Sequence, residues 1–81
     1  MELQIEYCSA WNYKPRAASV ADQLNEKYST EVKLVAGRGG SFEVTFDGNL
    51  IYSKLETGQF PTIGQITSAI DAWGKRAESW A

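Results

Sequence analysis

Three short segments in which apolar and polar side chains alternate constrain the fold of this 81-residue chain more than any other feature. Their apolar members are Leu3, Ile5 and Tyr7, then Val32, Leu34 and Ala36, then Phe42, Val44 and Phe46. The polar residues between them are Glu2, Gln4 and Glu6, then Glu31 and Lys33, then Glu43 and Thr45. Successive side chains of a strand point to opposite faces, so each segment is predicted to be a strand with one buried face. A sheet covered on both faces would show nearly continuous apolar runs, and we therefore expect one open face with solvated glutamates.

Two helices are predicted between and after these strands. Pro15 suits the first turn of a helix, and that helix should end near Ser29. The pair Pro61-Thr62 opens the second helix. Apolar residues follow at helical spacing in both, at Ala17, Val20, Ala21, Leu24 and Tyr28 and at Ile63, Ile66, Ile70 and Trp73.

A hairpin completes the pattern. Asp47-Gly48 is typical of a tight turn with positive φ, and it leads into a fourth strand from Leu50 to Lys54. The order β-α-β-β-β-α predicts an α/β (α+β) two-layer sandwich, a mixed four-stranded sheet with both helices on one face. Its first two strands should be parallel through a right-handed crossover. With residues 1–81 below the usual domain size of about 100–150, a single domain is expected.

Composition excludes several classes of function. The formal net charge of −2 argues against nucleic acid or an anionic membrane as a partner. The chain has no histidine and a single cysteine, which excludes a Ser-His-Asp triad, an internal disulfide and a zinc cluster, so no metal site is expected. No signal sequence or membrane span is recognisable, and a cytoplasmic location is expected.

Cys8 is the candidate nucleophile. It follows the first strand, and ligand crevices open at the carboxyl ends of parallel strands. The start of a helix, with Lys14 and Arg16 nearby, favours the charged thiolate, so we expect an accessible and reactive thiol. The alternative is that Cys8 is buried and inert, as free cysteines often are.

The residues around Cys8 resemble a known redox loop. The segment Tyr-Cys-Ser-Ala-Trp-Asn-Tyr-Lys-Pro-Arg at 7–16 is similar to the Cys-x-x-Sec or Cys-x-x-Cys loop of the selenoprotein W family. Phe-Glu-Val at 42–44, Gly-Asn-Leu-Ile-Tyr-Ser-Lys at 48–54 and Gly-Gln-Phe at 58–60 extend the resemblance over most of the chain. The resemblance implies a thioredoxin-like fold and thiol-disulfide redox chemistry, with glutathione as co-substrate and no bound cofactor.

Trp11 departs from this pattern because it occupies the position of the family's second redox residue. Without a second sulfur, Cys8 must act alone. Trp11 is either natural or stands at a selenocysteine position, since the codons UGA and UGG differ by one base. A purely structural reading, in which a large aromatic side chain packs over the loop, also stays open.

The loop Arg38, Gly39, Gly40 and Ser41 is the second candidate site. It lacks the helix and the Gly-Lys-Ser/Thr ending of a phosphate-binding loop. In thioredoxin-like folds this loop lies beside the cysteine, so its glycines would let a thiol peptide approach and Arg38 would meet a carboxylate of glutathione. The alternative is a flexible turn with a solvated arginine.

Two functions follow from these residues. In the first, the Cys8 thiolate forms a mixed disulfide with glutathione or with a protein thiol or disulfide, in a possible oxidoreductase of the selenoprotein W type. In the alternative, the chain is a catalytically degenerate thioredoxin-like module that binds a protein through the aromatic loop around Trp11. Tyr13 would share that surface, whereas Tyr7 is predicted to lie in the core.

Overall fold

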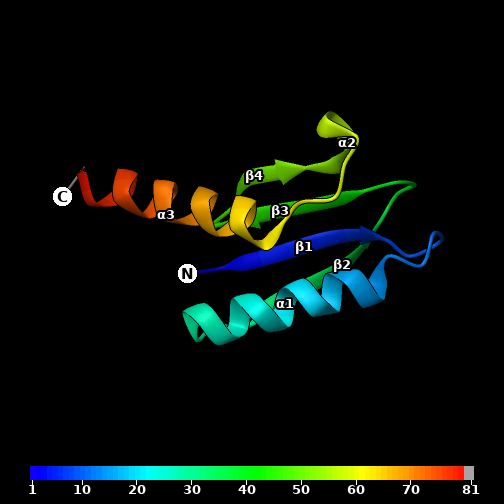
Figure 1. Cartoon of the computed structure of the whole chain (residues 1–81), viewed down its shortest axis with the longest axis horizontal. Coiled ribbons are helices and arrows are strands. Elements are labelled where there is room, and N and C mark those ends of the chain that lie inside the picture. The colour runs from blue at the N-terminus through cyan, green and yellow to red at the C-terminus, as the bar shows by residue number, and fades with distance from the viewer. Residues whose placement is uncertain (80–81) are drawn as a thin grey trace.

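The computed structural model describes residues 1–79, and side chains are described for residues 1–74. Its elements follow the predicted order, with one addition before the last helix (Figure 1). The strands are β1 (Leu3–Cys8), β2 (Val32–Gly37), β3 (Phe42–Phe46) and β4 (Asn49–Ser53). The helices are α1 (Lys14–Tyr28), α2 (Lys54–Thr57) and α3 (Ile63–Ser79).

The sheet is mixed and has the strand order β2-β1-β3-β4. As predicted, β1 is parallel to β2, and it is antiparallel to β3 on its other side. Figure 1 shows α1 and α3 side by side on the same face of the sheet. This thioredoxin-like, two-layer arrangement confirms the predicted fold class. It brings the β1–α1 loop, the β2–β3 loop and α2 to one end of the molecule.

The core lies between the helices and one face of the sheet. Leu3, Ile5 and Tyr7 are buried in β1, whereas Glu2 is exposed, as the alternation predicts. The other buried hydrophobic residues of this core are Ala17, Val20, Leu24, Phe42, Val44, Phe46, Ile66 and Ile70. Trp73 packs against the same core, in agreement with its predicted structural role. Trp80, which the sequence places after this helix, lies outside the described residues.

Local sequence signals determine how the elements begin and end. Asp47 and Gly48 both have positive φ, 49° and 83°, as the tight primed turn predicted for the hairpin requires. Helix α3 begins with a capping box, in which Thr62 Oγ1 accepts from Gln65 N (3.1 Å) and Gln65 Oε1 accepts from Thr62 N (2.8 Å). No helix within the described residues is long and apolar enough to cross a bilayer.

The short helix α2 was not predicted. Strand β4 runs one residue earlier than expected and ends at Ser53, whose Oγ accepts from Glu56 N (3.1 Å) as a helix N-cap. Glu43, expected to be a solvated residue of the open face, instead accepts from Lys54 N (2.8 Å) and from Ser53 Oγ (2.5 Å). The Ser-x-x-Glu spacing at 53–56 is the signal that would have revealed this helix.

Candidate functional site

Cys8 lies at the carboxyl end of β1, between the two loops that the sequence singles out. Its backbone N–H donates to Ser41 O (2.9 Å), and its carbonyl accepts from Tyr13 N (3.2 Å). The first bond continues the pairing of β1 with the β2–β3 loop, and the second joins β1 to the start of α1. Both candidate loops are therefore held directly by the backbone of Cys8.

The chain between Cys8 and Tyr13 forms one compact turn. Asn12 N donates to Ser9 O (3.2 Å), inside the outer bond from Tyr13 to Cys8. This nested pair is the hydrogen-bond pattern of a Schellman motif, and Asn12 takes the left-handed conformation, φ 58°, which the motif requires. Asparagine adopts that conformation more readily than most residues. The turn presents Trp11 to solvent with 61% of its surface exposed.

The Cys8 side chain is fully buried, with 0% of its surface exposed, so the expectation of an accessible thiol is wrong for this conformation. The strand continues through Cys8, which pairs with Gly37 of β2. Because side chains alternate, Cys8 shares its face of the sheet with Glu6, two positions earlier. A Cβ on Gly37 would lie within 3 Å of both the Glu6 side chain and Ser41 Oγ, so these two side chains converge over the glycine beside Cys8.

The β2–β3 loop divides into an exposed part and a buried part. Arg38 and Gly39 are exposed, and nothing lies within 4 Å of a Cβ built on Gly39. Gly40, with φ 78°, is buried against Trp11. A Cβ built on Gly40 would lie 3.3 Å from the Trp11 ring. Ser41 is fully buried, and its Oγ donates to Arg38 O (2.7 Å). The structure thus brings Gly40 to Trp11 and Ser41 to Cys8, and leaves Arg38 and Gly39 facing solvent.

An aromatic cluster adjoins the turn. Tyr13 contacts Trp11 edge to face, with ring centroids 6.0 Å apart, and contacts Phe60 at 4.7 Å. Phe60 in turn packs at 5.4 Å on the buried ring of Phe42. The sequence predicted a surface shared by Trp11 and Tyr13 but assigned no role to Phe60, which is remote from both in the sequence. Tyr7, by contrast, is 8% exposed and belongs to the core, as predicted.

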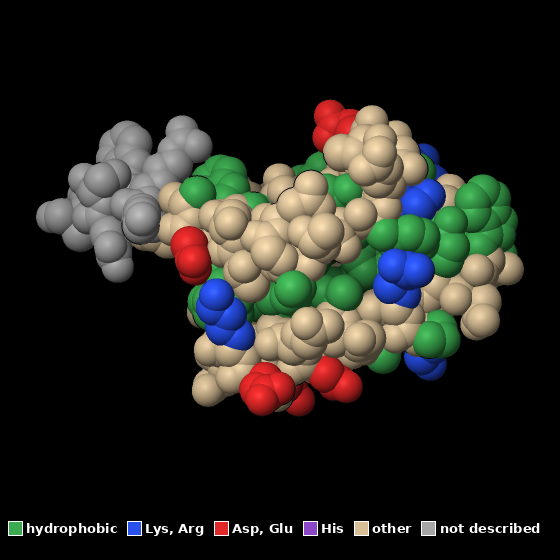
Figure 2. Space-filling model, viewed as in Figure 1, with side chains coloured by type: hydrophobic (Ala, Val, Ile, Leu, Met, Phe, Trp, Pro, Cys, Tyr) green, Lys and Arg blue, Asp and Glu red, His purple; other side chains and the backbone are tan. Residues whose placement is uncertain are grey.

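Two cations cover the cluster. The Arg16 guanidinium lies 4.1 Å from the centre of the Phe60 ring. Lys54 Nζ lies 5.1 Å from the same ring and 5.4 Å from that of Tyr13. These are cation–π distances. Figure 2 shows apolar side chains flanked by basic ones at one end of the molecule, and acidic side chains both over α2 at the top of the view and toward the other end.

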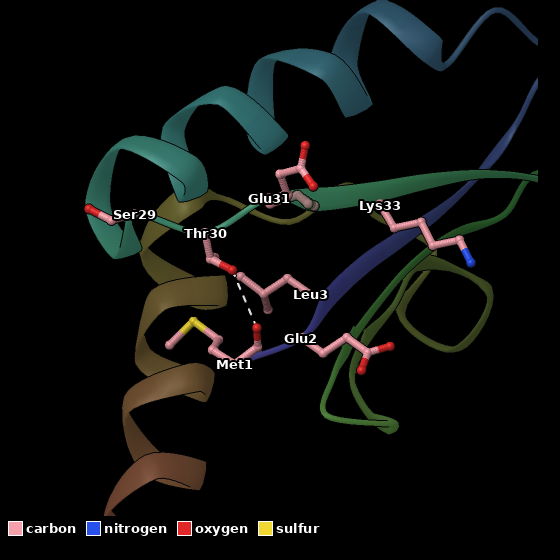
Figure 3. A pocket seen from close by; sticks show the side chains of 8 residues that line it. Met1, Glu2, Leu3, Ser29, Thr30, Glu31 and Lys33 are labelled. Atoms are coloured by element: carbon pink, nitrogen blue, oxygen red, sulfur yellow. Dashed lines mark hydrogen bonds between the residues drawn. The ribbon is translucent and has the colours of Figure 1, made fainter.

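One surface hollow lies away from Cys8. It has a volume of about 680 Å³ and is formed where the start of β1 meets the end of α1 and the start of β2 (Figure 3). Its lining residues are Met1, Glu2, Leu3, Ser29, Thr30, Glu31, Val32 and Lys33. None of the sequence-predicted site residues takes part. Over the described residues, no group of three or more potential metal ligands is present.

The chain is similar to known proteins over most of its length. The family model described as "Rdx family" matches residues 2–72. The proteins named "Migration and invasion enhancer 1" from Bos taurus and Mus musculus are each 31% identical over 71 residues, which is 86% of this chain. The chain spans only 62% of the length of these relatives.

Solved structures extend the likeness to the fold. A protein from Bordetella parapertussis has a TM-score of 0.82 at 27% sequence identity, with 88% of this chain and 94% of that one covered. A selenoprotein W-related protein from Vibrio cholerae has a TM-score of 0.76 at 27% identity, with 89% and 94% covered.

Proposed function

The chain belongs to the Rdx family, the family of the selenoprotein W-related proteins, and from this premise we propose that it is a thiol-disulfide redox protein whose nucleophile is Cys8. Family membership supports a redox-type function. The observation that carries the finer proposal is the position of Cys8 at the carboxyl end of β1, directly before the exposed turn that leads into α1. Ligand sites of open α/β sheets form at such strand ends.

The proposed reaction is thiol-disulfide exchange. The Cys8 thiolate attacks one sulfur of glutathione disulfide, a new S–S bond forms to that glutathione, and the other glutathione leaves as a thiolate. An external thiol then attacks the mixed disulfide at the glutathione sulfur and releases the Cys8 thiolate. A protein disulfide is an equivalent substrate, because the same bonds form and break.

Attack requires the buried thiol to become exposed. Ser9, Ala10 and Asn12 are exposed, and so is most of Trp11, so a shift of the turn would break few buried contacts. The turn is closed by two hydrogen bonds of 3.2 Å each. Segments held by few apolar contacts and solvent-exposed hydrogen bonds open at low free-energy cost. Opening of this turn is therefore our proposed first step.

In this proposal Trp11 occupies the position at which the family has its second redox residue. It lies three positions after Cys8 and has no sulfur, so a mixed disulfide on Cys8 is resolved from outside. If Trp11 stands at a selenocysteine position, the physiological protein has a selenol at the exposed tip of the turn. Sequencing the codon for residue 11 distinguishes UGA from UGG and decides between these two cases.

The β2–β3 loop is the proposed thiol-binding element. Arg38 is exposed and can pair with a carboxylate of glutathione, and the open space around Gly39 admits an extended peptide. Gly40 and Ser41 hold this loop against Trp11 and Cys8. Arg38→Gln should therefore slow adduct formation with glutathione disulfide and leave the rate with an uncharged disulfide unchanged.

Intact-mass spectrometry after incubation with glutathione disulfide tests the redox proposal. The wild type should accumulate one persistent glutathione adduct, and Cys8→Ser should accumulate none. Trp11→Cys should form an internal disulfide, because the turn brings positions 8 and 11 together. A native wild type that stays unmodified, while the urea-unfolded chain is modified under the same oxidant, would contradict the proposal.

One observation favours a second function, that of a protein-binding module without covalent chemistry. In this conformation the thiol is fully buried, whereas 61% of the Trp11 surface is exposed. Exposed aromatic groups are typical of contact surfaces. If Trp11→Cys accumulated a glutathione adduct but no internal disulfide, the turn would not be redox-competent and the binding module would be preferred.

A further inference from the structure

We infer that the end of the molecule around the turn binds an acidic polypeptide segment that also carries an apolar side chain. The surface consists of Trp11, Tyr13, Phe60, Arg16 and Lys54, and is called the aromatic–cationic face below. The inference goes beyond the proposed redox function, because recognition by this face uses rings and cations and does not depend on the Cys8 thiol.

The rings form a continuous row that is built on the core. Trp11, Tyr13 and Phe60 follow one another with centroid separations of 6.0 and 4.7 Å. Phe60 is anchored on Phe42, which is fully buried. A row anchored in this way loses little conformational entropy on binding, since its inner members are already ordered.

The two cations are available to an acidic ligand. Arg16 and Lys54 have ring contacts but no ion pair with any carboxylate among the described side chains. A guanidinium that lies over a ring retains N–H groups that can bind a carboxylate in bidentate fashion. Binding of a carboxylate at this point would therefore replace no existing ion pair.

The exposed tryptophan shows that the ligand needs more than negative charge. Trp11, at the outer end of the row, has 61% of its surface in contact with solvent. Glutathione has two carboxylates but no apolar side chain large enough to cover an indole. Nucleic acid could stack on the rings as well, and the titration described below tests that case with a short oligothymidylate. An acidic segment with a leucine or a similar residue satisfies both requirements.

The charge distribution supports the same ligand. Lys14 opens α1 and Arg38 lies on the β2–β3 loop, so with Arg16 and Lys54 four basic residues lie at this end, against the three carboxylates of Glu6, Glu43 and Glu56. Glu2, Glu31 and Asp71 lie toward the opposite end, together with the basic residues Lys27 and Lys33. Such an asymmetry orients an acidic partner during the encounter and speeds association.

The test is a titration of the ¹⁵N-labelled whole chain with the peptide acetyl-Glu-Glu-Leu-Glu-Glu-amide, followed by two-dimensional NMR. The amide signals of residues 11–16 and 54–60 and the Trp11 indole signal should shift. Binding should weaken as salt is raised, because both cations are near the surface. The matched peptide acetyl-Gln-Gln-Leu-Gln-Gln-amide should bind at least about tenfold more weakly.

Variants separate recognition from folding. Arg16→Gln combined with Lys54→Gln should weaken binding about tenfold, whereas Arg16→Lys should retain most of it. Trp11→Ala should weaken binding several-fold, and circular dichroism checks that each variant is folded. Lys33→Gln removes one positive charge at the opposite end of the molecule and should leave binding unchanged. Cys8→Ser should bind like the wild type, so a failure of the redox proposal is distinguishable from a failure of this one.

Several results would overturn the inference. Equal binding of the glutamine peptide would show that charge is not read, and equal weakening by Lys33→Gln would show that the face is not the site. Shifts of the same signals by glutathione or by a short oligothymidylate, at concentrations where the acidic peptide causes none, would assign the face to a small thiol or to nucleic acid.

Discussion

The two ends of the molecule are built from different interactions. At the end that carries Cys8, rings and cations form the contacts, with Arg16 on Phe60 and Phe60 on Phe42. At the opposite end, hydrogen bonds between side chains and backbone join the start of the chain to the hairpin turn and to the segment after α1. There Asp47 Oδ1 accepts from Glu2 N (2.6 Å), Thr30 Oγ1 donates to Met1 O (3.3 Å) and Asn25 Nδ2 donates to Thr30 O (2.7 Å).

This difference distinguishes side chains that stabilise the fold from side chains that are available to bind a ligand. The side chains of Asn25, Thr30 and Asp47 at the opposite end have partners within the chain, and Tyr28 Oη bridges the two long helices by donating to Asp71 Oδ1 (3.2 Å). At the thiol end, cations without carboxylate partners and an exposed indole remain. Interactions that are not satisfied within a fold are the ones that a ligand can satisfy.

The largest expected effect on stability is at Phe42, the buried ring that Phe60 packs against at the end of the molecule that carries Cys8. Phe42→Ala should destabilise the protein by about 3–5 kcal/mol, because it leaves a cavity in a fully buried position. Phe46→Ala, the same change near the opposite end, should cost less, since Phe46 is 9% exposed. Urea unfolding of both variants measures the comparison, and a larger loss for Phe46→Ala would reverse the assignment of the tighter core to the thiol end.

The next effect concerns the glycine beneath Trp11. Gly40→Ala should cost about 1–2 kcal/mol, because the residue has φ 78° and a Cβ would approach the indole to 3.3 Å. Gly39→Ala is the matched control. Nothing lies within 4 Å of a Cβ built on Gly39, so this substitution should change stability by less than about 0.5 kcal/mol. Equal thermal stability of the two variants would show that the loop does not depend on this conformation.

The hydrogen bond between the helices has a pH signature. Burial, and then the charge and hydrogen bond of Asp71, raise the pKa of Tyr28 above its usual 10.0. The stabilisation is therefore fully present below pH 10 and is lost as pH rises through the raised pKa, because the unfolded chain releases the proton first. Tyr28→Phe should cost about 0.5–1 kcal/mol at pH 8 and less at pH 11. The same loss at both pH values, measured by urea unfolding, would exclude this linkage.

The smallest effect on stability is expected at the most exposed ring. Trp11→Ala should change the free energy of unfolding by less than about 0.5 kcal/mol, since most of the side chain is in solvent. If the ring helps to close the turn over Cys8, the iodoacetamide labelling rate should still rise about twofold, as a local opening cheaper by that amount predicts. An unchanged rate would mean that the contact with Gly40 does not control access to the thiol.

Most of the fold was predictable because its signals are local. Alternation in β1, the turn residues Asp47 and Gly48, and Pro15 at the start of α1 each act within a few positions of the chain. The missed helix α2 also had a local signal, in the spacing of Ser53 and Glu56. Its second support, the capping of Lys54 by Glu43, comes from a neighbouring strand and could not be read from the spacing.

The candidate site was predictable as a set of residues but not as an arrangement. Cys8, Trp11 and the loop at 38–41 were identified from their positions in the sequence, and the structure does bring these segments together. The presence of Phe60 in the aromatic cluster was not predictable, because it depends on the chain after α2 lying against Tyr13 at the start of α1. Exposure of the thiol was predicted wrongly, since it depends on two loops that meet only in the folded chain.

The sequence by itself thus determined the order of the strands and helices, the parallel start of the sheet and the family of the chain, because periodicity, turn residues and short motifs act locally. Tertiary structure alone decided that the Cys8 thiol is covered and that Trp11 is exposed. The physical reason is that the burial of a side chain depends on which residues from other segments of the chain pack around it. Gly37 pairs with Cys8 in the sheet and Ser41 O accepts from its N–H, so both residues meet Cys8 through backbone pairing rather than through closeness in the sequence.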